Sequence, residues 1–301
     1  MTLAELALGT YRTYGVVAAA RTAIEQGVRW IDTAPNYQYG TAEKLLFPVL
    51  ERFPSVRVST KVGLLDETRQ AKASAAGVLT SSRLGKKFSL DPLYIAWQAR
   101  MSRTDLGRTP DVTFIHNPEI DEPSEKELDD RILRAFEALE ECCAQGLTKS
   151  YGVATWRGLH DGSITIDRLL ELAFKAGGGS NRFAAIQLPL SLIHPKPIAD
   201  ALENRGVLID AQAAQVEVFA SAPLHGGELL DIVTPEVARA VLPETHPLRV
   251  VLGTVAATPG VTRVLLSAST YKHWKAAYRY ARALPPFDPS DLRKIVDAFR
   301  S

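Results

Sequence analysis

Short apolar segments alternate with helical patterns along the whole sequence, and this alternation is the feature that most limits the fold. The apolar segments predict eight strands, at residues 6–10, 28–31, 56–61, 112–116, 148–153, 183–188, 216–220 and 261–266. Strands that alternate with helices pair in parallel, because each helix returns the chain to the start of the next strand. Eight such units predict an α/β chain folded as a (β/α)8 TIM barrel.

Helical patterns fill most of the intervals between these strands. They are predicted at residues 16–27, 41–53, 91–106, 125–145, 166–176, 208–214, 235–242, 248–258 and 270–284. The barrel core therefore spans about residues 6–284 within a single domain, residues 1–301. Residues 290–300 predict an appended C-terminal helix with Ser290 as its N-cap.

Two connections carry no clear helical pattern. Residues 63–91 and 191–205 are predicted to be irregular, and the first of these is a candidate substrate loop. A doubly wound open sheet is the alternative to the barrel. It is disfavoured because no G-x-G-x-x-G turn follows the first strand.

Composition excludes several classes of function. The chain has 301 residues, of which 46% are hydrophobic, and a formal net charge of +1. This charge gives no reason to expect a nucleic-acid or membrane partner, and no run of about 18 apolar residues predicts a membrane span. Cys142 and Cys143 are adjacent in a helical pattern, which predicts neither a disulfide nor a metal site. The N-terminal residues lack a signal-peptide pattern, so we expect a cytoplasmic protein. The sequence shows no heptad repeat or long exposed apolar helix, so we expect a monomer or small homo-oligomer.

Four chemically active side chains lie at or just beyond predicted strand ends. Asp32 follows the second strand, Tyr37 lies in the loop after it, Lys61 ends the third strand and His116 ends the fourth. The carboxyl ends of barrel strands meet at one mouth, where barrel enzymes place their active sites. The sequence therefore predicts that these four side chains come together, although each alone has a structural explanation as a cap, a rim aromatic or a core histidine.

An acid, a lysine and a tyrosine in one place predict a proton-donating device. The lysine ammonium is expected to lower the pKa of the Tyr37 phenol from about 10, while Asp32 keeps Lys61 charged. Tyr37 then donates a proton to a carbonyl oxygen that His116 orients. No side chain supplies a hydride, so this chemistry implies a nicotinamide cofactor and a small-molecule carbonyl or alcohol as substrate.

The motifs around these residues resemble those of the aldo-keto reductase superfamily. The matching segments are 8–11 (LGTY), 31–37 (IDTAPNY) with Gly40 and Glu43, 59–63 (STKVG), 115–119 (IHNPE), 151–153 (YGV), Gln187 and 221–229 (SAPLHGGEL). The resemblance implies a barrel enzyme that uses NADP, or less often NAD. It also implies Tyr37 as general acid, Lys61 and Asp32 as the residues that tune it, and His116 as the residue that orients the substrate.

The resemblance also implies a cofactor site and a substrate pocket. The implied cofactor residues are Gly9, Thr10, Ala154, Thr155, Gln187, Ser221, Ala222, Pro223, Leu224, Gly226, Ser267, Ser269, Lys272 and His273. Tyr11 and Trp156 are the candidate pocket aromatics, and no metal is implied.

The chain departs from the family at three cofactor positions. Ala154 and Thr155 stand where many members carry Ser and Asn, which hold the carboxamide. Ser221 stands where a tyrosine often stacks on the nicotinamide. Lys272 is expected near a 2′-phosphate, with His273 where an arginine is common.

Three functions remain open from the sequence. The first is a carbonyl reductase or alcohol dehydrogenase acting on a small metabolite. The second is a barrel enzyme that reuses the Tyr37–Lys61 pair for non-redox elimination or isomerisation, with weakened cofactor binding. The third is a non-catalytic regulatory subunit with the same fold.

Overall fold

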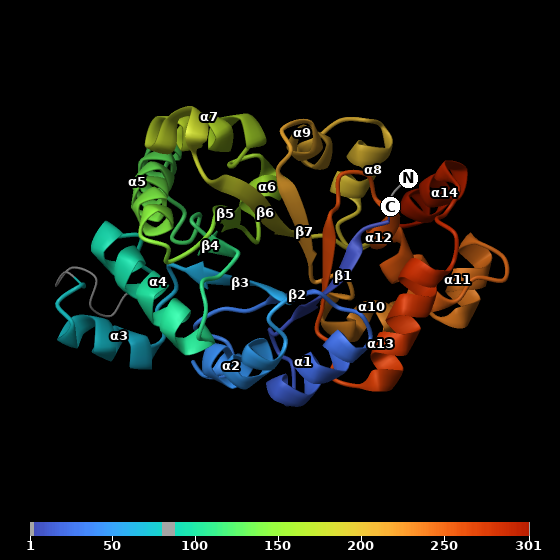
Figure 1. The fold of residues 1–301 in the computed structure, drawn as a ribbon. Helices are drawn as coiled ribbons and strands as arrows, with labels where there is room; N and C mark the ends of the chain where they lie inside the picture. Colours follow the sequence, from blue (N-terminus) through green and yellow to red (C-terminus); the bar gives the residue numbers. More distant parts are fainter. Residues whose placement is uncertain (1–2, 80–87, 301) are drawn as a thin grey trace.

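Eight parallel strands form the centre of the molecule (Figure 1). The computed structural model describes residues 3–79 and 88–300. The strands are β1 (Glu5–Gly9), β2 (Trp30–Asp32), β3 (Arg57–Val62), β4 (Val112–His116), β5 (Tyr151–Ala154), β6 (Phe183–Pro189), β7 (Glu217–Ser221) and β8 (Arg263–Leu266). They pair in chain order, and β1 also pairs with β8, which closes the sheet. The predicted (β/α)8 barrel is confirmed, and the open doubly wound sheet is excluded.

Helices surround the barrel (Figure 1). They are α1 (Val16–Glu25), α2 (Ala42–Arg52), α3 (Glu67–Ala75), α4 (Pro92–Leu106), α5 (Glu125–Ala144), α6 (Gly158–Asp161), α7 (Ile166–Gly177), α8 (Lys196–Leu202), α9 (Val207–Ala213), α10 (Glu228–Ile232), α11 (Pro235–Val241), α12 (Thr254–Ala257), α13 (Tyr271–Tyr278) and α14 (Pro289–Ala298). A π-helical segment, Arg249–Gly253, leads directly into α12, and another, Arg279–Ala283, follows α13.

Helix α3 lies within a connection that was predicted to be irregular. The Asp66 side chain caps it by accepting a hydrogen bond from the backbone N–H of Arg69 at 2.8 Å. The helix was missed because its sequence, ETRQAKASA, is mostly polar and buries only Arg69 and Ala73, so it shows no apolar period. Residues 80–87 of the candidate substrate loop lie outside the described residues.

Two further helix predictions need correction. Helix α8 occupies part of the connection at residues 191–205, and begins after Pro195. At the C-terminus, Asp288 rather than Ser290 is the N-cap of α14, because its carboxylate accepts from the Ser290 N–H at 2.8 Å. Pro289 takes the first helical position, where a missing N–H costs nothing.

Aromatic side chains fill the barrel interior. Phe219 lies at the centre, with its ring centroid 5.2 Å from that of Trp30 and 5.3 Å from that of Phe114. The three residues point inward because alternate residues of a strand face the same side. Each such edge-to-face pair contributes about 0.5–1.5 kcal/mol beyond its buried area. The interior is therefore a packed core.

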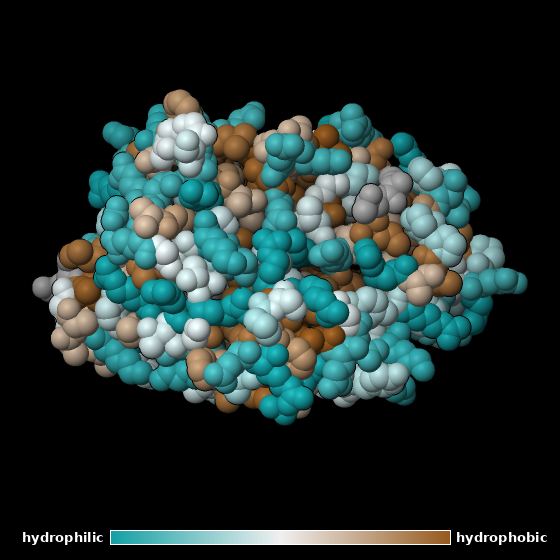
Figure 2. Space-filling model, viewed as in Figure 1, coloured by the Kyte–Doolittle hydropathy of each residue, from teal (hydrophilic) through white to brown (hydrophobic). Residues whose placement is uncertain are grey.

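The outer surface is mostly polar on the face drawn in Figure 2, where hydrophobic residues form small areas among hydrophilic ones. Within the described residues, no helix combines the length and the hydropathy needed to cross a membrane.

Candidate active site

A buried ion pair forms the base of the site. Lys61, near the end of β3, places its ammonium nitrogen 2.6 Å from Oδ2 of Asp32, the last residue of β2. The same ammonium donates to the carbonyl oxygen of Thr33 at 2.9 Å. Both side chains are almost completely buried. Because desolvating two charges is costly, a buried pair persists only when further hydrogen bonds satisfy it, as they do here.

The Asp32 carboxylate has a second support, which sequence reasoning missed. The Ser59 hydroxyl donates to Asp32 Oδ1 at 2.8 Å, and the Trp30 indole N–H donates to the Ser59 oxygen at 3.0 Å. The Trp30 ring lies between two guanidinium groups, those of Arg57 at 4.2 Å and Arg263 at 4.1 Å from the ring. The alternation of β3 was the available signal, because it places Ser59 on the same inward face as Lys61.

Tyr37 and His116 lie beside the ion pair. The ammonium of Lys61 is 5.0 Å from the centroid of the Tyr37 ring, and the Tyr37 and His116 ring centroids are 6.2 Å apart. The four residues, which the sequence places at or after three strand ends, therefore lie together. Burial, together with the charge of Lys61, holds the pKa of His116 well below its usual value. His116 is consequently neutral at neutral pH and offers one N–H and one lone pair.

The pKa of Tyr37 changes in the direction opposite to the prediction. Burial raises this pKa, Lys61 lowers it and Asp32 raises it, and the net direction is upward. The prediction was wrong because burial, which favours the neutral phenol, outweighs the attraction of Lys61, and Asp32 adds to the rise. For Lys61, burial lowers the pKa, but Asp32 and Tyr37 raise it overall. At neutral pH the site therefore holds a protonated phenol beside an ammonium.

The residues predicted to bind the nicotinamide differ in whether their side chains have hydrogen-bonding atoms without a partner. Gln187, near the end of β6, has a buried Oε1 atom with no hydrogen-bond partner, and its Nε2 lies 3.5 Å from Asp32 Oδ2. Thr155 is less available, because its hydroxyl donates to Glu119 Oε1 and accepts from the Gly158 N–H at 2.7 Å. Ala154 offers no polar side-chain atom. Gln187 is thus the side chain in this group with an unused acceptor.

The sequence shows Glu119 only as part of the IHNPE motif, but in the structure its carboxylate holds the turn after β5 at the barrel mouth. Its Oε1 accepts from the backbone N–H of Trp156 at 3.0 Å and of Arg157 at 3.1 Å, in addition to the Thr155 hydroxyl. These donors precede α6, whose first N–H groups have no partner within the helix. The carboxylate therefore holds the β5–α6 turn in place.

The remaining predicted cofactor residues lie at the ends of β1, β7 and β8. The Ser267 hydroxyl donates to the Gly9 carbonyl at 2.8 Å, and the Thr10 hydroxyl donates to the Asp32 carbonyl at 3.1 Å. Lys272 and His273 are exposed in the first turn of α13. The segment after β7 holds Ser221, Ala222, Pro223, Leu224 and Gly226, and Ser269 is half-buried just before α13.

The two candidate pocket aromatics lie at the surface. Tyr11 is 52% exposed, and its ring centroid is 5.2 Å from that of Tyr37. Trp156 is 58% exposed and follows the turn that Glu119 holds. The Tyr11 ring is therefore in contact range of the Tyr37 ring, which fits a pocket wall.

A family model described as the aldo/keto reductase family matches residues 5–237. The chain belongs to the aldo/keto reductase family. Solved aldo-keto reductases share its fold. One from Bacillus halodurans, in a holo form, is 20% identical with a TM-score of 0.71, covering 98% of this chain and 92% of the other. One from Klebsiella pneumoniae, in complex with NADP and acetate, is 18% identical with a TM-score of 0.67, covering 98% and 90%.

A curated relative of this aldo/keto reductase is D-threo-aldose 1-dehydrogenase from a Pseudomonas species. It is 30% identical over 147 residues, which is 46% of this chain and 43% of that protein. The alignment thus spans less than half of the length of that relative.

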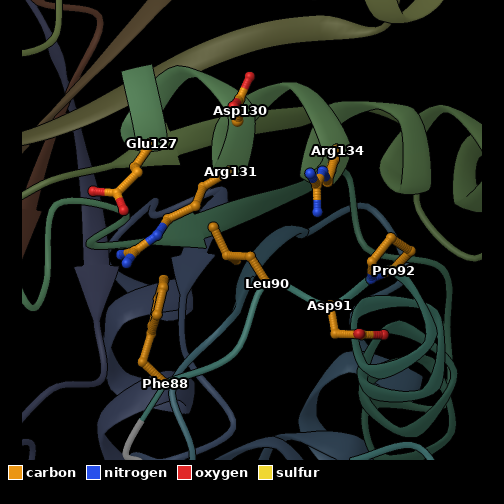
Figure 3. Close-up of a pocket in the computed structure, with 8 residues that line it drawn as sticks. All are labelled: Phe88, Leu90, Asp91, Pro92, Glu127, Asp130, Arg131 and Arg134. Carbon is orange, nitrogen blue, oxygen red and sulfur yellow. The ribbon is translucent and has the colours of Figure 1, made fainter. Parts of the chain in front are cut away.

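A cavity of about 330 Å³ lies apart from this site in the aldo/keto reductase (Figure 3). It is lined by Phe88, Leu90, Asp91, Pro92, Glu127, Asp130, Arg131 and Arg134. These residues come from the start of α4, the segment before it and the first half of α5. None of the four clustered side chains lines this cavity, so it is separate from the candidate site.

His116 makes a testable contribution to acid stability. Its pKa in the folded state is lowered, so the unfolded chain binds a proton first as the pH falls below about 6.5. This contribution is present above that pH and is lost as the pH falls toward the folded pKa. We expect His116→Gln to flatten the decline of the unfolding free energy between about pH 6.5 and pH 5. The same change at the exposed His273 is the control; equal slopes for wild type and His116→Gln in urea unfolding would contradict this.

Proposed function

We propose that the chain is an NAD(P)(H)-dependent oxidoreductase that reduces the carbonyl group of a small metabolite, or oxidises the matching alcohol. Membership of the aldo/keto reductase family supports the reaction class. The observation that carries the proposal is the buried Asp32–Lys61 pair beside Tyr37 and His116. A buried ion pair is a poor way to stabilise a fold, so a pair placed at the mouth beside a phenol favours a role in chemistry.

Each of the four side chains takes one role in carbonyl reduction. Neutral His116 donates its N–H to the substrate carbonyl oxygen and fixes its orientation. Tyr37 donates its phenolic proton to the same oxygen as negative charge develops there. Lys61 stabilises the phenolate that remains, and Asp32 keeps Lys61 charged and in place. A bound nicotinamide supplies the hydride in reduction, or accepts it in oxidation.

The residues at the mouth fit a nicotinamide nucleotide at two points. The buried, unpartnered Oε1 of Gln187 would accept from the carboxamide amino group. Lys272, exposed at the start of α13, would contact the 2′-phosphate of NADP, with the helix N-terminus adding a favourable dipole. Ser221 would lie beside the nicotinamide ring without stacking on it. We therefore propose NADP as the preferred nucleotide, with NAD also bound.

Fluorescence titration with NADPH and NADH tests the nucleotide proposal. We expect dissociation constants in the micromolar range, and we expect Lys272→Met to weaken NADPH binding about tenfold because it removes one charge-assisted phosphate contact. NADH binding should change little. Lys275→Met, one helical turn away, is the matched control. Equal effects of the two substitutions would assign both lysines to an ordinary solvated helix face.

The substrate proposal starts from the curated relative. Its name makes aldoses the first substrates to assay, by following reduction of NADP⁺ or NAD⁺. The exposed ring of Tyr11 beside Tyr37 offers an apolar face to such a substrate.

A non-redox function is the second candidate. The Thr155 hydroxyl is engaged by Glu119 and Ala154 has no polar group, so the carboxamide would find few side-chain partners. Absence of binding of either nucleotide at millimolar concentration would overturn the oxidoreductase proposal. It would favour elimination or isomerisation by the Tyr37–Lys61 pair.

A further inference from the structure

Arg69 is a buried arginine, 7% exposed, outside the catalytic cluster. It extends from α3 to the loop that carries Tyr37. Its Nε atom donates to the carbonyl oxygen of Pro35 at 3.1 Å. Its Nη2 atom lies 3.4 Å from Glu43 Oε2, and Nε lies 3.6 Å from Asp66 Oδ2. One guanidinium group therefore joins the β2–α2 loop, the first turn of α2 and the N-cap of α3.

Glu43 extends this set of contacts to the strand that carries Lys61. It is 1% exposed, and its Oε1 accepts from the Thr60 hydroxyl at 2.6 Å. Burial raises the pKa of Glu43, while Arg69 and the Thr60 hydrogen bond oppose that rise. A buried carboxylate of this kind needs its arginine, so the two residues stabilise each other in place.

The loop held by Arg69 has an unusual backbone. Gln38, Tyr39 and Gly40 have φ values of 51°, 54° and 82°, which place three consecutive residues in the left-handed region. Such a run is costly for non-glycine residues and persists only where the surroundings hold it. On the far side, the Gln38 amide donates to the Thr13 carbonyl at 2.7 Å. On the near side, the hydrogen bond to Pro35 is the matching attachment.

Pro35 is close enough to Tyr37 for its position to control that of the phenol. The Tyr37 N–H donates to the Ala34 carbonyl at 3.1 Å, so the residues between them form one tight turn. Movement of the Pro35 carbonyl would move the turn as a unit. Displacing a catalytic group by about 1 Å costs up to about a hundredfold in rate.

We propose that Arg69 is a positioning residue for Tyr37. Its contacts with Pro35, Glu43 and Asp66, here called the Arg69 clamp, hold the strained loop so that the phenol stays over Lys61. The proposal rests on the proposed function, because it assigns the clamp to the proton donor of that reaction. The proposal also gives α3 a role, because this helix carries the arginine that holds the loop after β2.

The experiment compares Glu43→Gln with the double variant Glu43→Gln/Arg69→Met. Both lack the buried carboxylate charge, so the comparison isolates Arg69 without leaving Glu43 unpaired. Lys72→Met, an exposed change on the same helix, is the control for loss of one positive charge. Thermal unfolding first establishes that each protein is folded.

Two readouts then test the clamp. Hydrogen–deuterium exchange of peptides covering residues 33–41 should be at least about tenfold faster in the double variant, because local opening requires less free energy. With NADPH and 4-nitrobenzaldehyde, kcat should fall about tenfold to a hundredfold relative to Glu43→Gln. The dissociation constant for NADPH should be unchanged. A purely structural role would instead change stability without separating kcat from nucleotide binding.

Unchanged exchange in residues 33–41 would overturn the clamp. Faster exchange with unchanged kcat would overturn the positioning of Tyr37. If the wild-type protein neither binds nucleotide nor reduces the aldehyde, the proposed function fails and this proposal fails with it. If the wild-type protein is active and the double variant behaves like Glu43→Gln, the proposed function stands and only the role of Arg69 is overturned.

Discussion

Replacing Tyr37 by phenylalanine should lower kcat for carbonyl reduction by about 10²- to 10⁴-fold, the range typical of losing a positioned general acid. The phenol is protonated at neutral pH, as its raised pKa requires, and the lost hydroxyl is the group that would meet the substrate oxygen. The ring remains, so packing against Tyr11 and His116 is preserved. Measurement of kcat with NADPH and an aldehyde checks this.

Nucleotide affinity separates this effect from a general loss of structure. The dissociation constant for NADPH should stay within about twofold of the wild type, because the hydroxyl acts on the substrate. Tyr39→Phe is the matched control, since Tyr39 belongs to the same loop and is fully exposed. Turnover retained by Tyr37→Phe would remove Tyr37 from the reaction.

Replacing Lys61 by methionine should have the largest effect on stability. It leaves the buried Asp32 carboxylate without its counter-charge, and breaking one side of such a pair costs about 3–5 kcal/mol. Ser59 still donates to Asp32, which sets a limit on the loss. Urea unfolding at neutral pH measures the change in free energy.

The neutral double variant Asp32→Asn/Lys61→Met distinguishes stability from chemistry. It removes both charges, so most of the lost unfolding free energy should return, while kcat stays near that of Lys61→Met. The Asp32–Lys61 pair also predicts how the stability of the wild-type protein changes with pH. The pKa of Lys61 is raised, so its stabilisation is complete below about pH 10 and is lost as the pH rises through the folded pKa. Recovery of activity in the double variant would contradict a catalytic role for the pair.

The strand pattern was readable from the sequence because each strand is a short apolar segment bounded by a helix or a turn. The candidate site could be predicted for a related reason: Asp32, Lys61 and His116 each lie at or near the end of such a segment, and barrel topology brings those ends together. Neither inference required knowledge of side-chain contacts. Helix α3 was not predicted because its sequence is mostly polar and it packs through only two residues, Arg69 and Ala73.

Contacts between distant segments were not readable. Ser59 reaches Asp32 across neighbouring strands, and Glu119 reaches the turn after β5 from the loop after β4. The sequence around Ser59 does not predict its contact with Asp32, and the sequence around Glu119 does not predict its contact with the turn after β5. The direction of the Tyr37 pKa was also beyond sequence reasoning, because it depends on the balance between burial, Lys61 and Asp32.

The hydrogen-bonded series from Trp30 through Ser59 to Asp32 has a consequence for protein engineering. When the interior of a barrel is redesigned for stability, the packed centre is usually assumed not to affect the residues at the mouth. Here the indole that packs on Phe219 is also the first member of the series that ends on the Asp32 carboxylate. A library that varies Trp30 for better packing would therefore also change the hydrogen bonding of Asp32.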